Sequence, residues 1–232
     1  MKKNLLLVFL IVLSFFLFDI HNLMAQSSIS LKVPGLIPYR KGDKWGYCNK
    51  EKEIIIPCTF VSVELFSEGL AAVKLGKTWG YIDEEGKLIS PIKYDESFSF
   101  HEGLAMVKLG DKYGYVNKEG KEVVPMKYDK AWDLIEGLAM VRIGERFSGK
   151  YGFVDKEGKE VIPLKYDESL EFHEGIAIVK LNEKWGFIDK EGKEFIPLKY
   201  DYAGYFNNGL AYVLLNGKYG YIDKNGSEYW EE

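Results

Sequence analysis

The sequence predicts an all-β fold: a tandem array of six three-stranded meander repeats that stack as an open, β-solenoid-like superhelix. The main observation is an aromatic–glycine dipeptide that recurs along the chain of 232 residues. It is found at Trp45-Gly46, Trp79-Gly80, Tyr113-Gly114, Tyr151-Gly152, Trp185-Gly186 and Tyr219-Gly220. Two further markers keep the same spacing, and 47% of the residues are hydrophobic, which is an ordinary globular composition.

The two further markers fix the limits of the repeats. A glycine that is mostly followed by Leu-Ala recurs at Gly69, Gly103, Gly137, Gly175 and Gly209, and a proline recurs at Pro57, Pro91, Pro125, Pro163 and Pro197. The step is 34 residues, except where four extra residues stand near positions 145–149. One domain is therefore expected at 35–232, with repeats at 35–68, 69–102, 103–136, 137–174, 175–208 and 209–232.

The repeat at 103–136 shows the expected elements in order. Residues 104–109 alternate as in a strand, and Gly110-Asp111 predicts a two-residue hairpin turn before a second strand at 113–117. A turn closed by Gly120 precedes a third strand at 122–128. Pro125 lies near the middle of that strand and requires an edge or a bulge, because proline cannot donate to a ladder. Residues 129–136 are expected to be a link to the next repeat.

Strand pairing predicts that both faces of each repeat are apolar. With Leu109 opposite Lys112, Val107 faces Gly114 and Ala105 faces Val116. The other face then carries Leu104, Met106, Tyr113 and Tyr115. A single three-stranded sheet cannot bury both faces, so each repeat is expected to be sandwiched between its neighbours.

A closed six-bladed, propeller-like ring is the alternative to an open array. Propeller blades typically have four strands and about 40 residues or more, whereas these repeats have three expected strands in a shorter unit. Propellers also commonly complete one blade from both chain ends, and neither end of this array offers a spare strand. Both observations favour the open array.

The repeat resembles that of the bacterial WG-repeat (KWG-repeat) proteins. The resemblance is carried by Lys-Trp-Gly-Tyr-Ile/Val-Asp-Lys-Glu-Gly-Lys-Glu-Val-Ile-Pro, then Lys-Tyr-Asp, then Glu-Gly-Leu-Ala, and it extends over residues 35–232. The pattern identifies a family and implies no particular activity. Repeats three, four and six carry Tyr in place of Trp, and Lys52 stands where the turn glycine belongs in repeat one. The irregular first and last repeats are typical of capping units.

The first 25 residues have the pattern of a secretory signal peptide. Lys2 and Lys3 precede an apolar run at 5–18, and cleavage after Ala25 would leave a short N-terminal segment at 26–34. The run is shorter than the roughly 20 residues that span a bilayer. We therefore expect export to the periplasm, the cell surface or the medium, without membrane insertion after cleavage.

The net charge bears on the class of partner, and the cysteine content bears on whether the chain contains a disulfide. The formal net charge of −4 argues against a nucleic-acid partner. An exported chain could pair its two cysteines, Cys48 and Cys58. Hairpin register places Ile54 opposite Cys48 and Lys44 opposite Cys58, which separates the sulfur atoms too far for a bridge without a bend at Pro57.

No cofactor, metal or catalytic group is expected. His101 and His173 occupy equivalent positions, but no further ligands stand at metal spacing. The Asp-Lys-Glu-Gly turns lack the alternating carboxylates of calcium loops. No nucleophile motif or phosphate loop is present, and carboxylates that recur in every repeat are typical of turns and solubility rather than of a catalytic pair.

Rows of aromatic residues are the strongest candidates for binding, although burial between repeats also explains them. The candidate ligand-binding strip is the Tyr-Asp dipeptide after each proline: Tyr94, Asp95, Tyr128, Asp129, Tyr166, Asp167, Tyr200 and Asp201. We therefore expect a non-enzymatic, exported repeat scaffold that binds a protein or a cell-envelope polymer. The alternatives are a carbohydrate-binding module that uses the aromatic rows and, less favoured, an envelope hydrolase.

Overall fold

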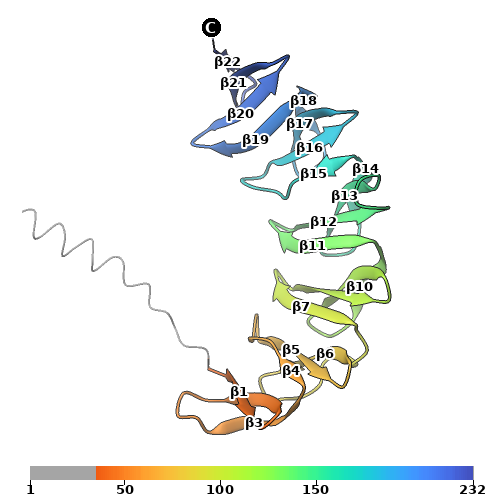
Figure 1. Ribbon diagram of the computed structural model, residues 1–232, viewed down its shortest axis with the longest axis vertical. Helices are drawn as coiled ribbons and strands as arrows, with labels where there is room; N and C mark the ends of the chain where they lie inside the picture. Colours follow the sequence, from red (N-terminus) through yellow and green to blue (C-terminus); the bar gives the residue numbers. More distant parts are fainter. Residues whose placement is uncertain (1–34, 232) are drawn as a thin grey trace, which may run out of the picture. The chain divides into compact units, whose positions relative to one another are not determined.

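The computed structural model describes residues 35–231, and the contacts within the chain separate Met1–Gly35 from Leu36–Glu232. Leu36–Glu232 folds as six antiparallel sheets, each a meander in chain order (Figure 1). The expected signal peptide and the segment 26–34 lie outside the described residues. Between residues 35 and 231 no helix is long and apolar enough to cross a membrane.

The sheets, numbered 1 to 6 along the chain, have three or four strands. Sheet 1 comprises β1 (Ile37–Lys41), β2 (Lys44–Cys48) and β3 (Ile54–Phe60), and sheet 2 comprises β4 (Ser62–Val63), β5 (Leu70–Leu75) and β6 (Thr78–Asp83). Sheet 3 comprises β7 (Glu96–His101), β8 (Leu104–Leu109), β9 (Lys112–Asn117) and β10 (Glu122–Tyr128), and sheet 4 comprises β11 (Lys130–Ile135), β12 (Leu138–Ile143), β13 (Lys150–Asp155) and β14 (Glu160–Tyr166). Sheet 5 comprises β15 (Glu168–Ser169), β16 (Ala177–Leu181), β17 (Lys184–Ile188) and β18 (Glu194–Tyr200), and sheet 6 comprises β19 (Tyr202–Asn207), β20 (Leu210–Leu215), β21 (Lys218–Asp223) and β22 (Glu228–Trp230).

The segment expected to be a link is a strand in most repeats. In sheet 4 this strand, β11, pairs with β12, and the register shifts between Ala131 and Leu134. The shift places both side chains in the core although they are three residues apart. Each complete sheet therefore begins with the segment that precedes Gly-Leu-Ala. The all-β tandem array is confirmed, and four of its sheets have a strand more than the sequence predicts.

The predicted pairing of the central hairpin is confirmed. Val107 lies opposite Gly114 and Ala105 lies opposite Val116. The ladder between β9 and β10 is irregular on both sides of Pro125, as the proline requires. A Cβ atom on Gly114 would lie 2.5 Å from the carbonyl oxygen of Val124. The glycine of the aromatic–glycine dipeptide thus lets the bulged third strand lie directly over the second.

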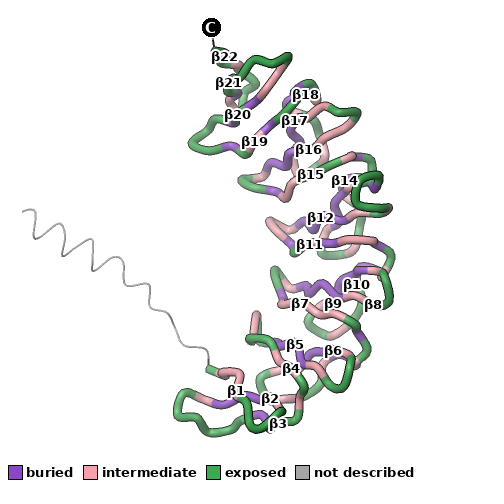
Figure 2. Tube along the Cα trace, in the orientation of Figure 1, coloured by how far each residue is buried: buried purple, intermediate pink, exposed green. Residues whose placement is uncertain are grey.

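The cores form between consecutive sheets, as the two apolar faces predict. One face of sheet 3 packs its Leu104, Met106 and Tyr115 against sheet 4, where Ala139 and Val141 leave room for them. Its other face packs against sheet 2 in a cluster built by Leu70, Ala72, Tyr81, Ala105, Val107 and Val116. Burial is therefore concentrated along the strands, and the turns are exposed (Figure 2).

The array is open, so the closed ring is not the fold. Strands contact strands of their own sheet or of the next one, as β8 does β11 and β17 does β19. Within residues 35–231 no substantial contact joins sheet 1 to sheet 6. Four-stranded sheets are typical of propeller blades, so the strand count does not favour an open array and that part of the sequence argument was wrong. Sheet 6 has its full set of strands without any from the N-terminal side, as the argument from the chain ends predicts.

Both cysteines are free. The register confirms that Cys48 lies opposite Ile54. The expected pairing of Lys44 with Cys58 is wrong, because the ladder shifts between Tyr47 and Trp45 and places Phe60 opposite Trp45. Cys48 is buried, and the sulfur of Cys58 lies 3.5 Å from the carbonyl oxygen of Tyr39.

Candidate functional site

The tyrosines of the predicted Tyr-Asp strip are buried between sheets. All four, Tyr94, Tyr128, Tyr166 and Tyr200, have at most 1% of their surface exposed. The hydroxyl of Tyr128 donates to Glu160 at 3.3 Å, and that of Tyr200 donates to Glu228 at 2.5 Å. Burial raises the pKa of each of the four phenols, so each hydroxyl keeps its proton and remains a donor.

The aspartates of the strip connect consecutive sheets. Each Oδ2 accepts the N–H of the first turn residue in the next sheet's central hairpin, in the pairs Asp95–Gly110, Asp129–Gly144, Asp167–Asn182 and Asp201–Asn216. Three of the aspartates also bind the lysine that precedes the aromatic–glycine dipeptide of their own sheet, in the pairs Lys112–Asp129, Lys150–Asp167 and Lys184–Asp201. Thr78 occupies the lysine position that would serve Asp95.

These contacts explain why the repeat contains both Lys-Trp-Gly and Lys-Tyr-Asp. A hydrogen bond from its lysine partner holds the pKa of Asp129, Asp167 and Asp201 below the usual range. The charged carboxylate joins a strand of one sheet to the hairpin of the next. The eight residues of the predicted strip therefore have structural roles in the joints, and a ligand at them stays a prediction.

A second set of joints lies at the Glu-Gly turns, which the sequence did not single out for a function. The glutamates of these turns have positive backbone φ angles, between 49° and 53°, at Glu68, Glu102, Glu136 and Glu174. Such angles are uncommon for residues other than glycine. The carboxylates of Glu68, Glu102 and Glu136 reach forward to the next turn. Glu102, for example, accepts the N–H groups of Glu136 and Gly137 at 2.9 and 2.7 Å. No sequence signal marks this contact, because it joins residues a full repeat apart.

The one irregularity in the repeat spacing produces the largest departure from the regular surface. The four extra residues lie in the β12–β13 hairpin, and Phe147 at its tip is 95% exposed. The joint beneath is intact, since Gly144 still donates to Asp129 at 2.8 Å. The guanidinium of Arg146 lies 5.4 Å from the centre of the Phe147 ring. The insertion therefore adds an exposed aromatic side chain to a complete joint.

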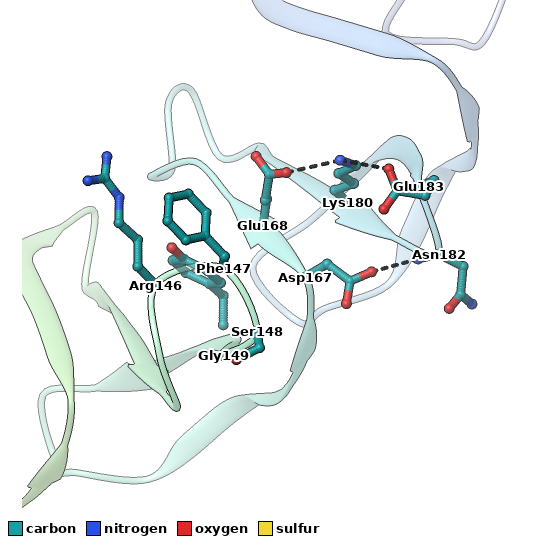
Figure 3. Close-up of a pocket in the computed structure, with 10 residues that line it drawn as sticks. Arg146, Phe147, Ser148, Gly149, Asp167, Glu168, Lys180, Asn182 and Glu183 are labelled. Atoms are coloured by element: carbon teal, nitrogen blue, oxygen red, sulfur yellow. Dashed lines mark hydrogen bonds and ion pairs between the residues drawn. The ribbon is translucent and has the colours of Figure 1, made fainter.

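A hollow of about 600 Å³ lies between this insertion and sheet 5. Figure 3 shows Phe147 above one end, facing Glu168 of β15, with Lys180 on the far side. Lys180 lies 3.0 Å from Glu168 and 3.1 Å from Glu183. Asp167 lines the hollow below them.

Two further hollows follow this one, and each shares at least one lining residue with the hollow before it. Tyr151 lines both the first hollow and a second of about 370 Å³, which Trp132 and Leu170 also line. Glu171 and Tyr205 line both the second hollow and a third of about 570 Å³. The three hollows follow the outer strands of sheets 4, 5 and 6. We call them together the β15 groove.

Aromatic and acidic side chains line the β15 groove. Trp132 and Tyr151 have ring centres 5.8 Å apart, and His173 and Tyr205 have ring centres 5.9 Å apart. Two permanently charged cations, Arg146 and Lys180, line the groove. Five carboxylates line it as well, those of Asp167, Glu168, Glu171, Glu174 and Glu183. The groove thus combines apolar platforms with an excess of negative charge.

The carboxylates of the groove differ in the direction in which their pKa values are shifted. Burial and the negative charge of Asp133 raise the pKa of Glu171. A hydrogen bond from Lys224 lowers the pKa of Glu174, and one from Lys150 lowers that of Asp167. Glu171 forms no ion pair among the described residues, and it lies at the point where the second and third hollows meet.

Comparisons with known proteins identify the repeat. A family model described as WG containing repeat matches residues 45–79, 79–113, 113–147, 151–185 and 185–219. No curated protein matches the chain. Among solved structures, a eukaryotic initiation factor has a TM-score of 0.53 at 12% identity over 85% of this chain, which spans 62% of that protein. That similarity shows the fold alone.

Two other similar structures have lower scores. The extracellular domain of a one-component system from B. thetaiotaomicron has a TM-score of 0.34 at 9% identity, and 85% of this chain spans 35% of it. Kluyveromyces lactis Hsv2 has a TM-score of 0.41 at 8% identity, with 82% of this chain and 71% of that chain covered.

Proposed function

The chain belongs to the WG-repeat family, and on that basis we propose that it is an exported, non-enzymatic scaffold that binds an extended, positively charged segment of a partner protein. The segment would lie in the β15 groove. The observation that carries this proposal is the exposed Phe147 beside an acidic, aromatic groove, at the one place where the repeat spacing is broken. The proposal of export rests on the signal-peptide pattern of residues 1–25.

The chemistry of the groove suits a cationic peptide. Side chains in an extended segment point alternately to either side. Successive side chains of the segment can therefore contact the aromatic rings and the carboxylates of the groove. Phe147 offers a large, rigid contact, of the kind that dominates protein interfaces. Glu171, which forms no ion pair among the described residues, offers a carboxylate to a lysine or an arginine.

The same groups do not favour a hydrolase. General acid–base catalysis works best with a pKa near the working pH. Hydrogen bonds lower the pKa of Asp167 and raise that of Lys180, so both groups are held in their charged forms. Glu171 has a raised pKa, but burial is its main cause, and the carboxylate that adds to it, Asp133, lies in the outer strand of another sheet.

A glycan is the second candidate, on a separate observation. Sugar rings stack on exposed aromatic faces, and Tyr205, which is 46% exposed, borders two hollows of the groove. The regular aromatic rows contribute less to this alternative, because five of the six residues that follow the aromatic–glycine dipeptides are buried; these are Tyr47, Tyr81, Tyr115, Phe153 and Phe187.

Affinity capture from cell-envelope extract tests the proposal, with bound proteins quantified by mass spectrometry. We expect the wild type to retain a protein that Phe147→Ala and Glu171→Gln each lose, and expect that retention to weaken as salt rises. Leu75→Ala is the matched control, since Leu75 is an exposed apolar residue at the end of the corresponding strand of sheet 2. Identical captured proteins for all variants would contradict the proposal. Retention of envelope polysaccharide after protease treatment of the extract, if lost in Phe147→Ala, would favour the glycan.

A further inference from the structure

The second hollow of the β15 groove, of about 370 Å³, is lined by aromatic rings and a single carboxylate. Trp132 and Tyr151 belong to sheet 4, and their ring centres lie 5.8 Å apart. Tyr205 of sheet 6 lines the hollow as well, and so does Glu171, which precedes β16 of sheet 5. Within residues 35–231, Glu171 is the one charged side chain of this lining.

The lining does not recur along the array. Trp132 lies in the β-bulge of β11, and its carbonyl oxygen accepts a hydrogen bond from the hydroxyl of Tyr115, which fixes the backbone that carries the ring. The residues that correspond to Trp132 in sheets 2, 3, 5 and 6 are Glu64, Phe98, Leu170 and Gly204. Those that correspond to Tyr205 in sheets 2 to 5 are Leu65, Ser99, Asp133 and Glu171. The combination of Trp132 with Tyr205 therefore belongs to this place in the array and is not part of the repeated joint.

A neighbouring repeat shows that rings of this array hold cations. Tyr113 of sheet 3 corresponds to Tyr151, and the ammonium group of Lys130 in the next sheet lies 4.9 Å from its ring centre. The residue of sheet 5 that corresponds to Lys130 is Glu168, which has no cation to place on Tyr151. Arg142 lies 5.8 Å from the Tyr151 ring centre but does not line the second hollow. The side of Tyr151 that lines the hollow is therefore open to a cation from outside the chain.

Glu171 supplies the countercharge for such a cation. Burial and the negative charge of Asp133 raise the pKa of Glu171, which is the response of a carboxyl group without a cation beside it. The hydroxyl of Ser169, which also lines the hollow, donates to the carbonyl oxygen of Leu170 at 3.2 Å. The hollow thus offers aromatic faces and one carboxylate, but few acceptors for the N–H groups of a ligand.

From these observations we infer that the second hollow binds the quaternary ammonium group of a small organic cation. Such a group is attracted to aromatic faces and to a carboxylate, and it has no N–H that needs an acceptor. A primary ammonium group has three N–H donors, which the aromatic lining would leave without partners. This site goes beyond the proposed binding of a partner protein, because the small cation binds to the chain alone.

Choline and ethanolamine are matched probes for this site, because they differ only in three N-methyl groups. Isothermal titration calorimetry of the full purified chain at neutral pH measures the dissociation constant of each. We expect choline to bind at one saturable site, with a dissociation constant at least ~10-fold lower than that of ethanolamine. Trp132→Ala and Glu171→Gln, tested separately, should each raise the dissociation constant of choline at least ~10-fold.

Phe147→Ala is the control variant, since Phe147 lines the first hollow and not the second. It should leave choline binding unchanged while it abolishes capture of the partner protein, so the two proposals can fail separately. Circular dichroism checks that each variant keeps its sheets, and Glu171→Gln changes a partly buried side chain with little change of shape.

Three outcomes would overturn the inference: no saturable binding of choline, equal dissociation constants for choline and ethanolamine, or choline binding that neither Trp132→Ala nor Glu171→Gln weakens. Phosphocholine, which carries the same group as part of a lipid headgroup, distinguishes the sources of the ligand. Its phosphate should weaken binding among the carboxylates of the groove. Tighter binding of phosphocholine than of choline would overturn the assignment to a small organic cation.

Discussion

Replacing Gly152 by alanine should destabilise the array more than any glycine change in an exposed turn. Gly152 follows Tyr151 in β13, and the bulged strand β14 crosses directly above it. A Cβ atom there would lie 2.6 Å from the carbonyl oxygen of Ile162, 2.9 Å from the amide nitrogen of Leu164 and 2.9 Å from the carbonyl carbon of Pro163. All three are backbone atoms, so no rotamer change can relieve the contact.

The magnitude follows from the distance that β14 must move. Ordinary contacts of a Cβ atom begin at about 3.4 Å, so the strand must shift by most of an ångström, and overpacking of this kind costs about 3 kcal/mol. Gly137, in the β11–β12 turn of the same sheet, is the matched control. Its φ is +85° and nothing lies within 4 Å of its added Cβ, so alanine there costs only the left-handed backbone penalty of about 1 kcal/mol.

Urea unfolding followed by tryptophan fluorescence measures the difference. With a slope of about 2 kcal/mol per molar, the midpoint should fall by about 1.5 M for Gly152→Ala and by about 0.5 M for Gly137→Ala. Gly80→Ala should be intermediate, because the nearest atom to its Cβ is the side-chain Cγ1 of Ile92 at 2.8 Å. Equal midpoints for Gly152→Ala and Gly137→Ala, at an unchanged slope, would refute the close-approach explanation of the motif.

Three further predictions follow from the joints and the leader. Partners hold the pKa of Asp129, Asp167 and Glu136 below the ordinary values of 3.8 and 4.5, so their stabilisation is present above those values and is lost as the pH falls below them through the lowered pKa values of the folded chain; a melting temperature that stays constant from pH 6 to pH 3 would contradict this. An excised peptide of residues 96–128, one complete sheet, should show no cooperative melt, because both of its faces are core; a cooperative circular-dichroism transition would be the contrary result. N-terminal sequencing of the exported chain should begin at or near Gln26, and an intact Met1 would count against the signal peptide.

The sequence predicts the parts of the fold that depend on local pattern. The aromatic–glycine, glycine and proline markers locate the central hairpins, and alternation gives the pairing of Val107 with Gly114. The first strands of sheets 2 to 6 were not predicted. In β7, β11 and β19 a register shift interrupts the alternation, and β4 and β15 have only two residues each. Ala131 and Leu134 are both buried although an unbroken strand would point them to opposite faces. A pattern of period two cannot detect such a strand.

The joints required contacts that no local pattern reveals. Asp129 was selected for its place beside a tyrosine, but its partners Lys112 and Gly144 lie in different repeats. Glu102 was noted only as part of the Glu-Gly-Leu-Ala motif, whereas its carboxylate accepts hydrogen bonds from the next turn along the array. Phe147 could have been found, since the longer repeat step points to its loop. The aromatic rows recur in every repeat and therefore gave the stronger sequence signal.

The joints and the β15 groove also show how this array separates stability from binding. The aspartates of the Tyr-Asp dipeptides each have a partner in the neighbouring sheet, so changing any of them should weaken the stack. The insertion differs, because Gly144 keeps its bond to Asp129 while Arg146 and Phe147 extend beyond it. The hairpin turn can therefore lengthen without disturbing the joint below. If so, deleting residues 145–148, which leaves Gly144 and Gly149 as a two-residue turn, should leave the urea midpoint within ~0.5 M of the wild type while abolishing partner capture. A loss of stability as large as that expected for Gly152→Ala would show instead that the insertion is part of the stack.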